Sequence, residues 1–264
     1  MKIVPIIIIV VFLGAVTYFL VFVTGNERRR RQAVARYVED KPDFVSLGKP
    51  SKSLNKLQEQ FESGQLRPEG LPEKQRKRAE RDLYLLNLIS SIPYFDVNFD
   101  STQATHWALN VIRMPEDDFN QVLMDHKYRP NTGEDAPTYF YTCAFFVPER
   151  NTLPDFIMYW DPEVPDDVGN GIALDADPDF SKKYRIVTEN EAGVRRLFTK
   201  NIIDFLMANE RYVFSCSDNC LRILLRKSEW RAFAYKGDRI KPKYLGEYID
   251  TTAELFTALR ESLR

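Results

Sequence analysis

The side chains most suited to binding chemistry lie in an acidic segment, DPEVPDDVGNGIALDADPD, at residues 161–179. It holds seven carboxylates and no basic side chain, and hard cations such as Ca²⁺ prefer oxygen ligands of this kind. The spacing from Asp175 follows the start of an EF-hand loop, but Phe180 replaces the required glycine and Ile186 the bidentate glutamate. We therefore favour a solvated acidic loop, with a metal site or a site for a basic partner as the alternative. Its four candidate ligands are Asp161, Asp166, Asp175 and Asp177.

Other residue types that carry catalysis are scarce. The two histidines, His106 and His126, are expected on the polar face of a strand and just before a loop, as ordinary surface or hydrogen-bonded residues. The sequence holds none of the large nucleotide-binding, hydrolase or zinc-protease motifs. These observations favour a non-enzymatic protein without a cofactor. They leave open a motif-poor enzyme that uses the acidic segment.

The three cysteines are too few for a disulfide scaffold, and Cys216 and Cys220 flank a predicted hairpin turn. Their side chains could face each other across the two strands. A zinc site would need two further ligands with comparable spacing, which neither Cys143 nor the histidines provide. Small buried residues at a strand end are therefore the favoured interpretation.

The elements that must position these residues begin with an uncharged apolar stretch at residues 3–24. About 20 such residues span a hydrocarbon core as a helix. A cleavable signal peptide would need a shorter apolar region and a small-residue cleavage site, and this stretch has neither. We expect a retained transmembrane anchor that contacts the lipid bilayer through residues 3–24.

Basic residues on the two sides of the anchor predict its orientation. Only Lys2 precedes it, whereas four consecutive arginines follow it. The more basic side stays in the cytoplasm, so an N-out, C-in topology with a cytoplasmic domain is expected. The arginines are also suited to meeting lipid phosphates. These orientation-setting residues are Arg28, Arg29, Arg30 and Arg31.

Beyond the anchor we expect a juxtamembrane basic segment and linker with one short helix over 25–71, and a globular domain over 72–264. Caps, prolines and apolar spacing predict helices. Their ranges are 53–64, 72–91, 188–199, 201–209 and a last helix after residue 242, with a further start at Pro115. Runs of apolar and aromatic residues predict strands at 106–114, 138–147, 155–160, 211–216 and 220–227. Strands and helices without regular alternation favour an α+β fold with a mainly antiparallel sheet and packed helices.

Thirty-seven basic and 38 acidic residues give a net charge of −1, which supplies no general attraction for nucleic acid. We therefore expect no nucleic-acid partner and favour a protein partner. The main function hypothesis is a membrane-anchored interaction or membrane-complex module. A lipid or envelope-transport accessory is a further alternative, beside the motif-poor enzyme.

The segments LPDFIMYW, DPDFSKKYRI and EAGVRRLFTKNIIDFL resemble a pattern of uncharacterised bacterial single-pass membrane-anchored proteins. The shared pattern is LPxF, then DPxFSxxY, then VRxLF, over roughly residues 145–260. The resemblance implies attachment to a bacterial membrane. It implies no catalytic activity.

Overall fold

The computed structural model describes residues 27–39, 44–92, 104–116, 119–133, 136–149, 152–160, 171–174, 178–209, 212–225, 235–236 and 244–263. The predicted anchor, residues 3–24, lies outside these ranges. None of the helices in the described part of the chain is long and apolar enough to cross a membrane.

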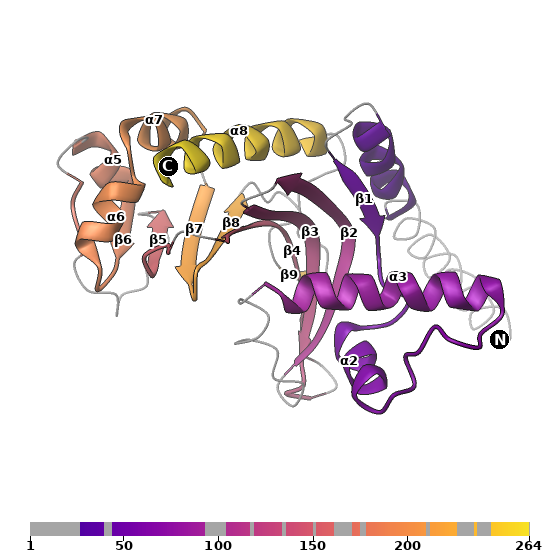
Figure 1. The fold of residues 1–264 in the computed structure, drawn as a ribbon. Coiled ribbons are helices and arrows are strands. Elements are labelled where there is room, and N and C mark those ends of the chain that lie inside the picture. Colours follow the sequence, from indigo (N-terminus) through magenta and orange to yellow (C-terminus); the bar gives the residue numbers. More distant parts are fainter. Residues whose placement is uncertain are drawn as a thin grey trace, which may run out of the picture.

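One nine-stranded sheet organises the fold (Figure 1). Its strands run in the order β1-β2-β3-β4-β8-β7-β5-β6, and every neighbouring pair along this path is antiparallel. The short β9 pairs with β4 in parallel. The strands are β1 (Val45–Gly48), β2 (Ala104–Glu116), β3 (Phe119–Pro130), β4 (Thr138–Pro148), β5 (Phe156–Trp160), β6 (Tyr184–Val187), β7 (Tyr212–Ser217), β8 (Cys220–Leu225) and β9 (Tyr235–Lys236). The predicted α+β fold with a mainly antiparallel sheet is confirmed.

The helices pack on both faces of this sheet. Residues 27–39 are helical, and this element is called helix 27–39 below. The others are α2 (Leu54–Glu62), α3 (Glu73–Ser90), α5 (Pro178–Lys183), α6 (Glu191–Leu197), α7 (Lys200–Ala208) and α8 (Leu245–Leu263). Ser53 caps α2 by accepting from the Lys56 N–H, and Pro72 directly precedes α3, as predicted.

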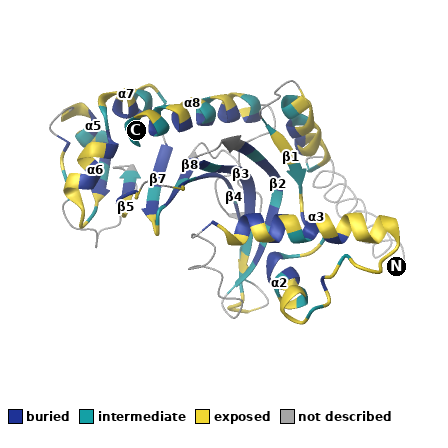
Figure 2. Ribbon diagram, viewed as in Figure 1, coloured by how far each residue is buried: buried dark blue, intermediate teal, exposed yellow. Residues whose placement is uncertain are grey.

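Two apolar cores follow from this arrangement. On one face, α6, α7, α8 and helix 27–39 contribute to a core in which Phe146 of β4 stacks on Phe256 of α8. On the other face, α2 and α3 cover β2, β3 and β4, with Leu54 and Leu85 fully buried. Figure 2 shows the consequence for α3, which is exposed all round over its first turns and buried along one side from Ala79 onward. Below, the face of the sheet that packs against α8 is called the α8 face, and the face that packs against α3 is called the α3 face.

One predicted helix start is wrong. Pro115 does not begin a helix, because it lies near the end of β2, and β3 begins at Phe119. The two strands form a hairpin in which Glu116 pairs with Phe119. The strand β3 escaped sequence analysis because it is covered on both faces and therefore lacks alternation of apolar and polar residues.

A second difference concerns which residues of β2 are buried. Alternation predicted a buried Trp107 and a polar, exposed His106, but Trp107 is half-buried and His106 is only 5% exposed. The cause is a β-bulge, since Asn110 and Val111 together lie opposite the single residue Met124 of β3. Helices also pack on both faces of β2, but they cover the two sets of alternate residues unequally: His106 and Ala108 are buried, whereas Trp107 and Leu109 are half-buried.

Candidate functional site

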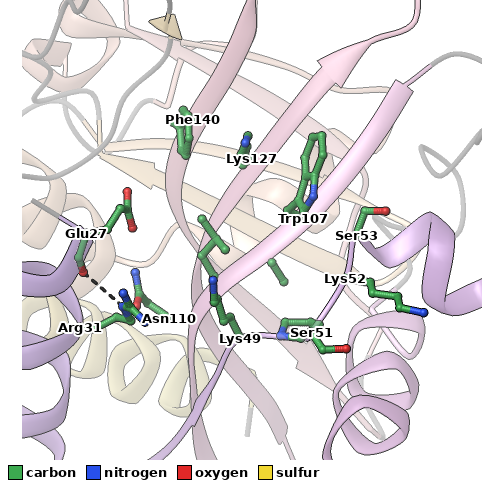
Figure 3. A pocket seen from close by; sticks show the side chains of 13 residues that line it. Glu27, Arg31, Lys49, Ser51, Lys52, Ser53, Trp107, Asn110, Lys127 and Phe140 are labelled. Atoms are coloured by element: carbon green, nitrogen blue, oxygen red, sulfur yellow. Dashed lines mark hydrogen bonds between the residues drawn. The ribbon is translucent and has the colours of Figure 1, made fainter. Parts of the chain in front are cut away.

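A pocket of about 480 Å³ opens on the α8 face of the sheet, beside helix 27–39 (Figure 3). This volume lies in the range of small-molecule binding sites. The lining comes from helix 27–39, from the loop 49–53 between β1 and α2, and from strands β2, β3 and β4. Four separate elements and one loop therefore shape a single cavity.

The floor of the pocket consists of one residue from each of three adjacent strands. Trp107 of β2 pairs with Lys127 of β3, which in turn pairs with Phe140 of β4. The ammonium group of Lys127 lies 4.4 Å from the Trp107 ring centroid and 5.5 Å from that of Phe140. Figure 3 shows the three side chains standing side by side. Cation–π attraction to both rings holds this positive charge at the floor of the pocket.

The loop 49–53 forms one wall of the pocket. Its own hydrogen bonds hold it to α3 and α2, and α2 in turn is bound to β2 through Asn55. The backbone N–H of Ser51 donates to Asp82 of α3 at 2.9 Å, and the Ser51 hydroxyl donates to the same carboxylate. Ser53 is the N-cap of α2. Asn55, in the first turn of α2, accepts from the backbone N–H of His106 at 2.8 Å and donates to the carbonyl of Ala104 at 3.1 Å. The wall is therefore tied to α3, α2 and β2 at once.

Four of the lining side chains are basic and one is acidic. Lys127 lies in the floor, and Arg31, Lys49 and Lys52 are exposed. The acidic residue is Glu27. Neither Lys49 nor Lys52 forms an ion pair with another described residue, so no carboxylate of the described part neutralises them. The pocket is therefore suited to an anion.

A buried ion pair lies directly behind the pocket and joins helix 27–39 to the sheet. The Nε and Nη2 atoms of Arg30 donate to the two carboxylate oxygens of Asp125 on β3. The two residues are 2% and 1% exposed. The same Nη2 donates to the Thr142 hydroxyl at 2.8 Å, and that hydroxyl donates to Asp125 at 2.8 Å. A bidentate pair with further hydrogen bonds is the arrangement in which a buried charge is tolerated.

The bulged residue Asn110 links this ion pair to the pocket, because it belongs to both. Its side-chain amide donates to Asp125 at 2.8 Å, and the residue also lines the cavity. Its backbone has φ = 52°, in the left-handed region that Asn tolerates better than most residues. The bulge thus directs the Asn110 side chain toward the buried Asp125 carboxylate, while Asn110 also forms part of the pocket lining.

The structure separates the four arginines that were predicted to set membrane orientation. Arg28, Arg29 and Arg31 are exposed, whereas Arg30 is buried in the ion pair with Asp125. Sequence analysis missed this second role, because nothing in a run of identical residues marks one of them as internal. The burial pattern follows from helical geometry, since Val34, four positions later on the same helix face, belongs to the apolar core.

Most of the acidic segment 161–179 lies outside the described residues. Its four candidate metal ligands, Asp161, Asp166, Asp175 and Asp177, lie outside the described residues. Within the described ranges, no group of three or more His, Cys, Asp or Glu side chains could hold a metal ion.

The two histidines form a buried pair on the α3 face, which corrects the expectation of surface positions. His126 lies within β3 rather than before a loop, and the Nδ1 of His106 is 3.0 Å from the Nε2 of His126. Their rings stack on each other and on Tyr128. Burial lowers the pKa of His106, and burial together with the neighbouring His106 and Arg222 lowers the pKa of His126 to about 3. Both imidazoles are therefore neutral near pH 7.

Cys216 and Cys220 do not face each other across the hairpin, which was the possibility left open by the sequence. The hairpin turn has two residues, Asp218 and Asn219, both with positive φ, so that Ser217 pairs with Cys220. Cys216 consequently belongs to the core of the α8 face, and Cys220 to the core of the α3 face. All three cysteines of the chain are free and buried, which fits the favoured interpretation of small core residues.

Comparison with known proteins adds no further constraint on this site. No protein-family model, no curated protein and no solved structure was found to match the chain.

Proposed function

We propose that this chain is a single-pass membrane protein whose α+β domain lies in the cytoplasm and acts as a non-enzymatic binding module. The apolar stretch at residues 3–24 is the anchor, and the basic residues after it retain the domain on the inner side. The binding site is the pocket beside helix 27–39. Its ligand is an anion, because basic side chains dominate the lining.

The observation that carries this proposal is the bond between Arg30 and Asp125. Helix 27–39 begins three positions after the anchor ends at residue 24, and its Arg30 is bound to the middle of the sheet. An anchor and a domain joined by a long flexible linker would move independently. Here the first helix after the anchor is part of the core, so the pocket keeps a fixed place relative to the membrane.

The chemistry of the lining supports binding rather than catalysis. Glu27 is the only carboxylate among the described residues of the lining, and a carboxylate is a usual general base. Catalysis by a nucleophile and a base needs the two groups within mutual hydrogen-bond reach. The serine hydroxyls of the lining are instead engaged elsewhere: that of Ser51 donates to Asp82, and that of Ser53 accepts from the Lys56 N–H. The lining offers cations, hydroxyls and aromatic rings, which are groups that bind and orient an anion.

Two measurements on membranes from expressing cells test the proposal. After alkaline carbonate extraction, we expect the full chain to stay in the membrane pellet, and release into the supernatant would refute the anchor. A fluorescent protein that matures only in the cytoplasm, fused after Arg264, should be bright. A dark fusion of normal abundance would refute the cytoplasmic placement of the domain.

A further inference from the structure

We infer that the pocket beside helix 27–39 is a phosphate site, which holds the phosphate group of an anionic lipid headgroup or of a small phosphate ester. The inference deepens the proposed function by naming the ligand class. Its lipid source rests on the proposed anchor, whereas the phosphate chemistry of the pocket does not.

The first argument is the convergence of positive charge from independent elements. Arg31 comes from helix 27–39, Lys49 and Lys52 from the loop 49–53, and Lys127 from β3. A guanidinium and three ammonium groups are the donors that proteins most often use for phosphate. Basic residues within one surface segment would need no ligand to explain why they lie together. Cations from three elements around one cavity instead indicate a common ligand.

The second argument comes from the aromatic floor, which selects against ligands with a flat ring system. The ammonium group of Lys127 lies over the Trp107 ring at 4.4 Å and is also close to Phe140. A nucleobase would need a ring face on which to stack. The ring faces that look toward Lys127 already contact its ammonium group, so this floor favours a compact anion. The rings also keep Lys127 partly out of water, where its attraction for an anion is stronger.

The third argument is that the wall of the pocket is preorganised. Asp82, which is 3% exposed, holds Ser51 through both the backbone N–H and the hydroxyl. Ser53 and Asn55 fix the chain on the C-terminal side of this contact. A loop that is already ordered loses little conformational freedom when a ligand arrives, which favours binding.

Chain length places this phosphate site near lipid phosphates. Three residue steps separate residue 24, where the predicted anchor ends, from Glu27 in the lining. Even fully extended, three steps cover only about 11 Å. The headgroup layer on each side of the hydrocarbon core is itself roughly 5–8 Å thick. Glu27 therefore lies within reach of the headgroup layer, and phospholipids are the phosphate esters with the highest local concentration there.

The test uses the full chain and compares two variants with the same loss of charge. Arg31→Gln with Lys49→Gln removes two exposed cations of the pocket. Lys56→Gln with Lys74→Gln removes two exposed cations from α2 and α3 that do not line it. Because all four positions are exposed, both variants should fold. Lys127→Gln is a third variant that removes the floor charge.

In the first arm, the chain in nanodiscs of phosphatidylcholine is titrated with glycerol 1-phosphate by calorimetry, with glycerol as the uncharged comparison. We expect saturable binding of the ester alone. The dissociation constant should rise about tenfold or more in the pocket variant and in Lys127→Gln, since each loses a charged hydrogen bond. It should change less than about twofold in the α2/α3 variant. Absence of ester binding, together with a negative second arm, would overturn the inference.

In the second arm, the chain is released from bilayers of equal phosphatidylglycerol and phosphatidylcholine, and retained lipid is measured by native mass spectrometry. A phosphatidylglycerol adduct that the pocket variant loses and the α2/α3 variant keeps would assign the site to lipid. Ester binding without such an adduct would assign it to a soluble phosphate ester. Adducts and ester affinities that are equal in all variants would overturn the phosphate site. Carbonate extraction separately reports whether the anchor holds, so the two proposals can fail independently.

Discussion

The guanidinium group of Arg30 and the carboxylate of Asp125 are paired through two N–H···O bonds, although 95 positions separate them in the sequence. Thr142 of β4 and Asn110 of β2 also donate hydrogen bonds to this carboxylate. One helix and three strands therefore meet at a single buried charge pair. The helix is the one that follows the apolar stretch, so this pair couples the N-terminal region to the centre of the sheet.

Substitution of Arg30 by methionine should strongly destabilise the chain. The methionine fills part of the arginine's volume but leaves the Asp125 carboxylate buried without its counter-charge. Such a change costs about 3–5 kcal/mol. The free energy of unfolding, measured with urea on the full chain in detergent, should fall by this amount.

A neighbouring arginine provides the matched control for this substitution. Arg29 is exposed on the same helix, so Arg29→Met should change the free energy of unfolding by no more than about 0.5 kcal/mol. The double variant Arg30→Met with Asp125→Leu removes both charges and should recover part of the loss. Equal effects of Arg29→Met and Arg30→Met would show that the buried pair does not hold the helix.

The bulge at Asn110 predicts an unusual order of stability among substitutions. Asn110→Ala and Asn110→Gly both lose the hydrogen bond to Asp125. Alanine also has to adopt φ near 52°, which costs about 1–2 kcal/mol, whereas glycine adopts this conformation without a steric penalty. Asn110→Gly should therefore unfold at higher urea concentration than Asn110→Ala. The reverse order would mean that the left-handed conformation at this position is not required.

The buried histidine pair predicts a loss of stability in mild acid. The pKa of His126 is lowered from 6.5 to about 3 in the folded chain, so below pH 6.5 the unfolded chain binds a proton that the folded chain does not. The free energy of unfolding therefore falls as the pH drops from about 6.5 toward 3. At pH 5 the loss from His126 is roughly 2 kcal/mol, because each pH unit contributes about 1.4 kcal/mol.

A variant identifies the source of this pH dependence. The variant His126→Gln lacks the group that takes up a proton on unfolding. Its free energy of unfolding should therefore vary less between pH 7 and pH 5 than that of the wild type. Urea unfolding at both pH values measures the difference. Parallel decreases in the two proteins would assign the acid sensitivity to other groups.

The three cysteine thiols should be inert in the folded chain. All are buried, burial raises the pKa of Cys143 to about 12, and burial also raises the pKa of Cys216. Thiolate is the reactive form, so maleimide near neutral pH should label the native protein slowly and the urea-unfolded protein completely. The exposed position Ser90→Cys should label at once. Rapid labelling of native Cys216 or Cys220, or a disulfide between them after mild oxidation, would contradict their placement on opposite faces of the sheet.

Local sequence signals predicted α2, α3, α6, α7, α8 and the β7–β8 hairpin, but they missed α5 and placed a helix start at Pro115 in what is a strand. Ser53 and Pro72 mark the beginnings of α2 and α3, and the polar residues after Cys216 mark a tight turn. These features depend on residues that are close together in the chain, where side-chain chemistry acts directly on the local backbone. The α+β class followed from the same elements.

The site could not be predicted in this way, because its parts come together only through strand pairing. The pocket floor consists of Trp107, Lys127 and Phe140, which lie on three different strands. The alternation of residues within one strand cannot show that these three are neighbours. Arg30 is one of four consecutive arginines, and their predicted role in membrane orientation gave no reason to expect that one of them is buried. Its partner, Asp125, lies on β3, the strand that sequence analysis did not identify. Because β3 carries both Asp125 and Lys127, neither the ion pair nor the pocket floor could be predicted without this strand.

If the pocket lies at the membrane surface as proposed, it should be close enough to the lipid headgroups for fluorescence quenching. A fluorophore attached at Lys49→Cys in the full chain, where the native thiols are buried, reports on the pocket rim. Nitroxide carried on lipid headgroups should quench it nearly as strongly as a fluorophore at Arg29→Cys. If the label at Arg29→Cys is quenched and the label at Lys49→Cys is not, the pocket does not lie at the membrane surface, which contradicts the proposed position of the binding site.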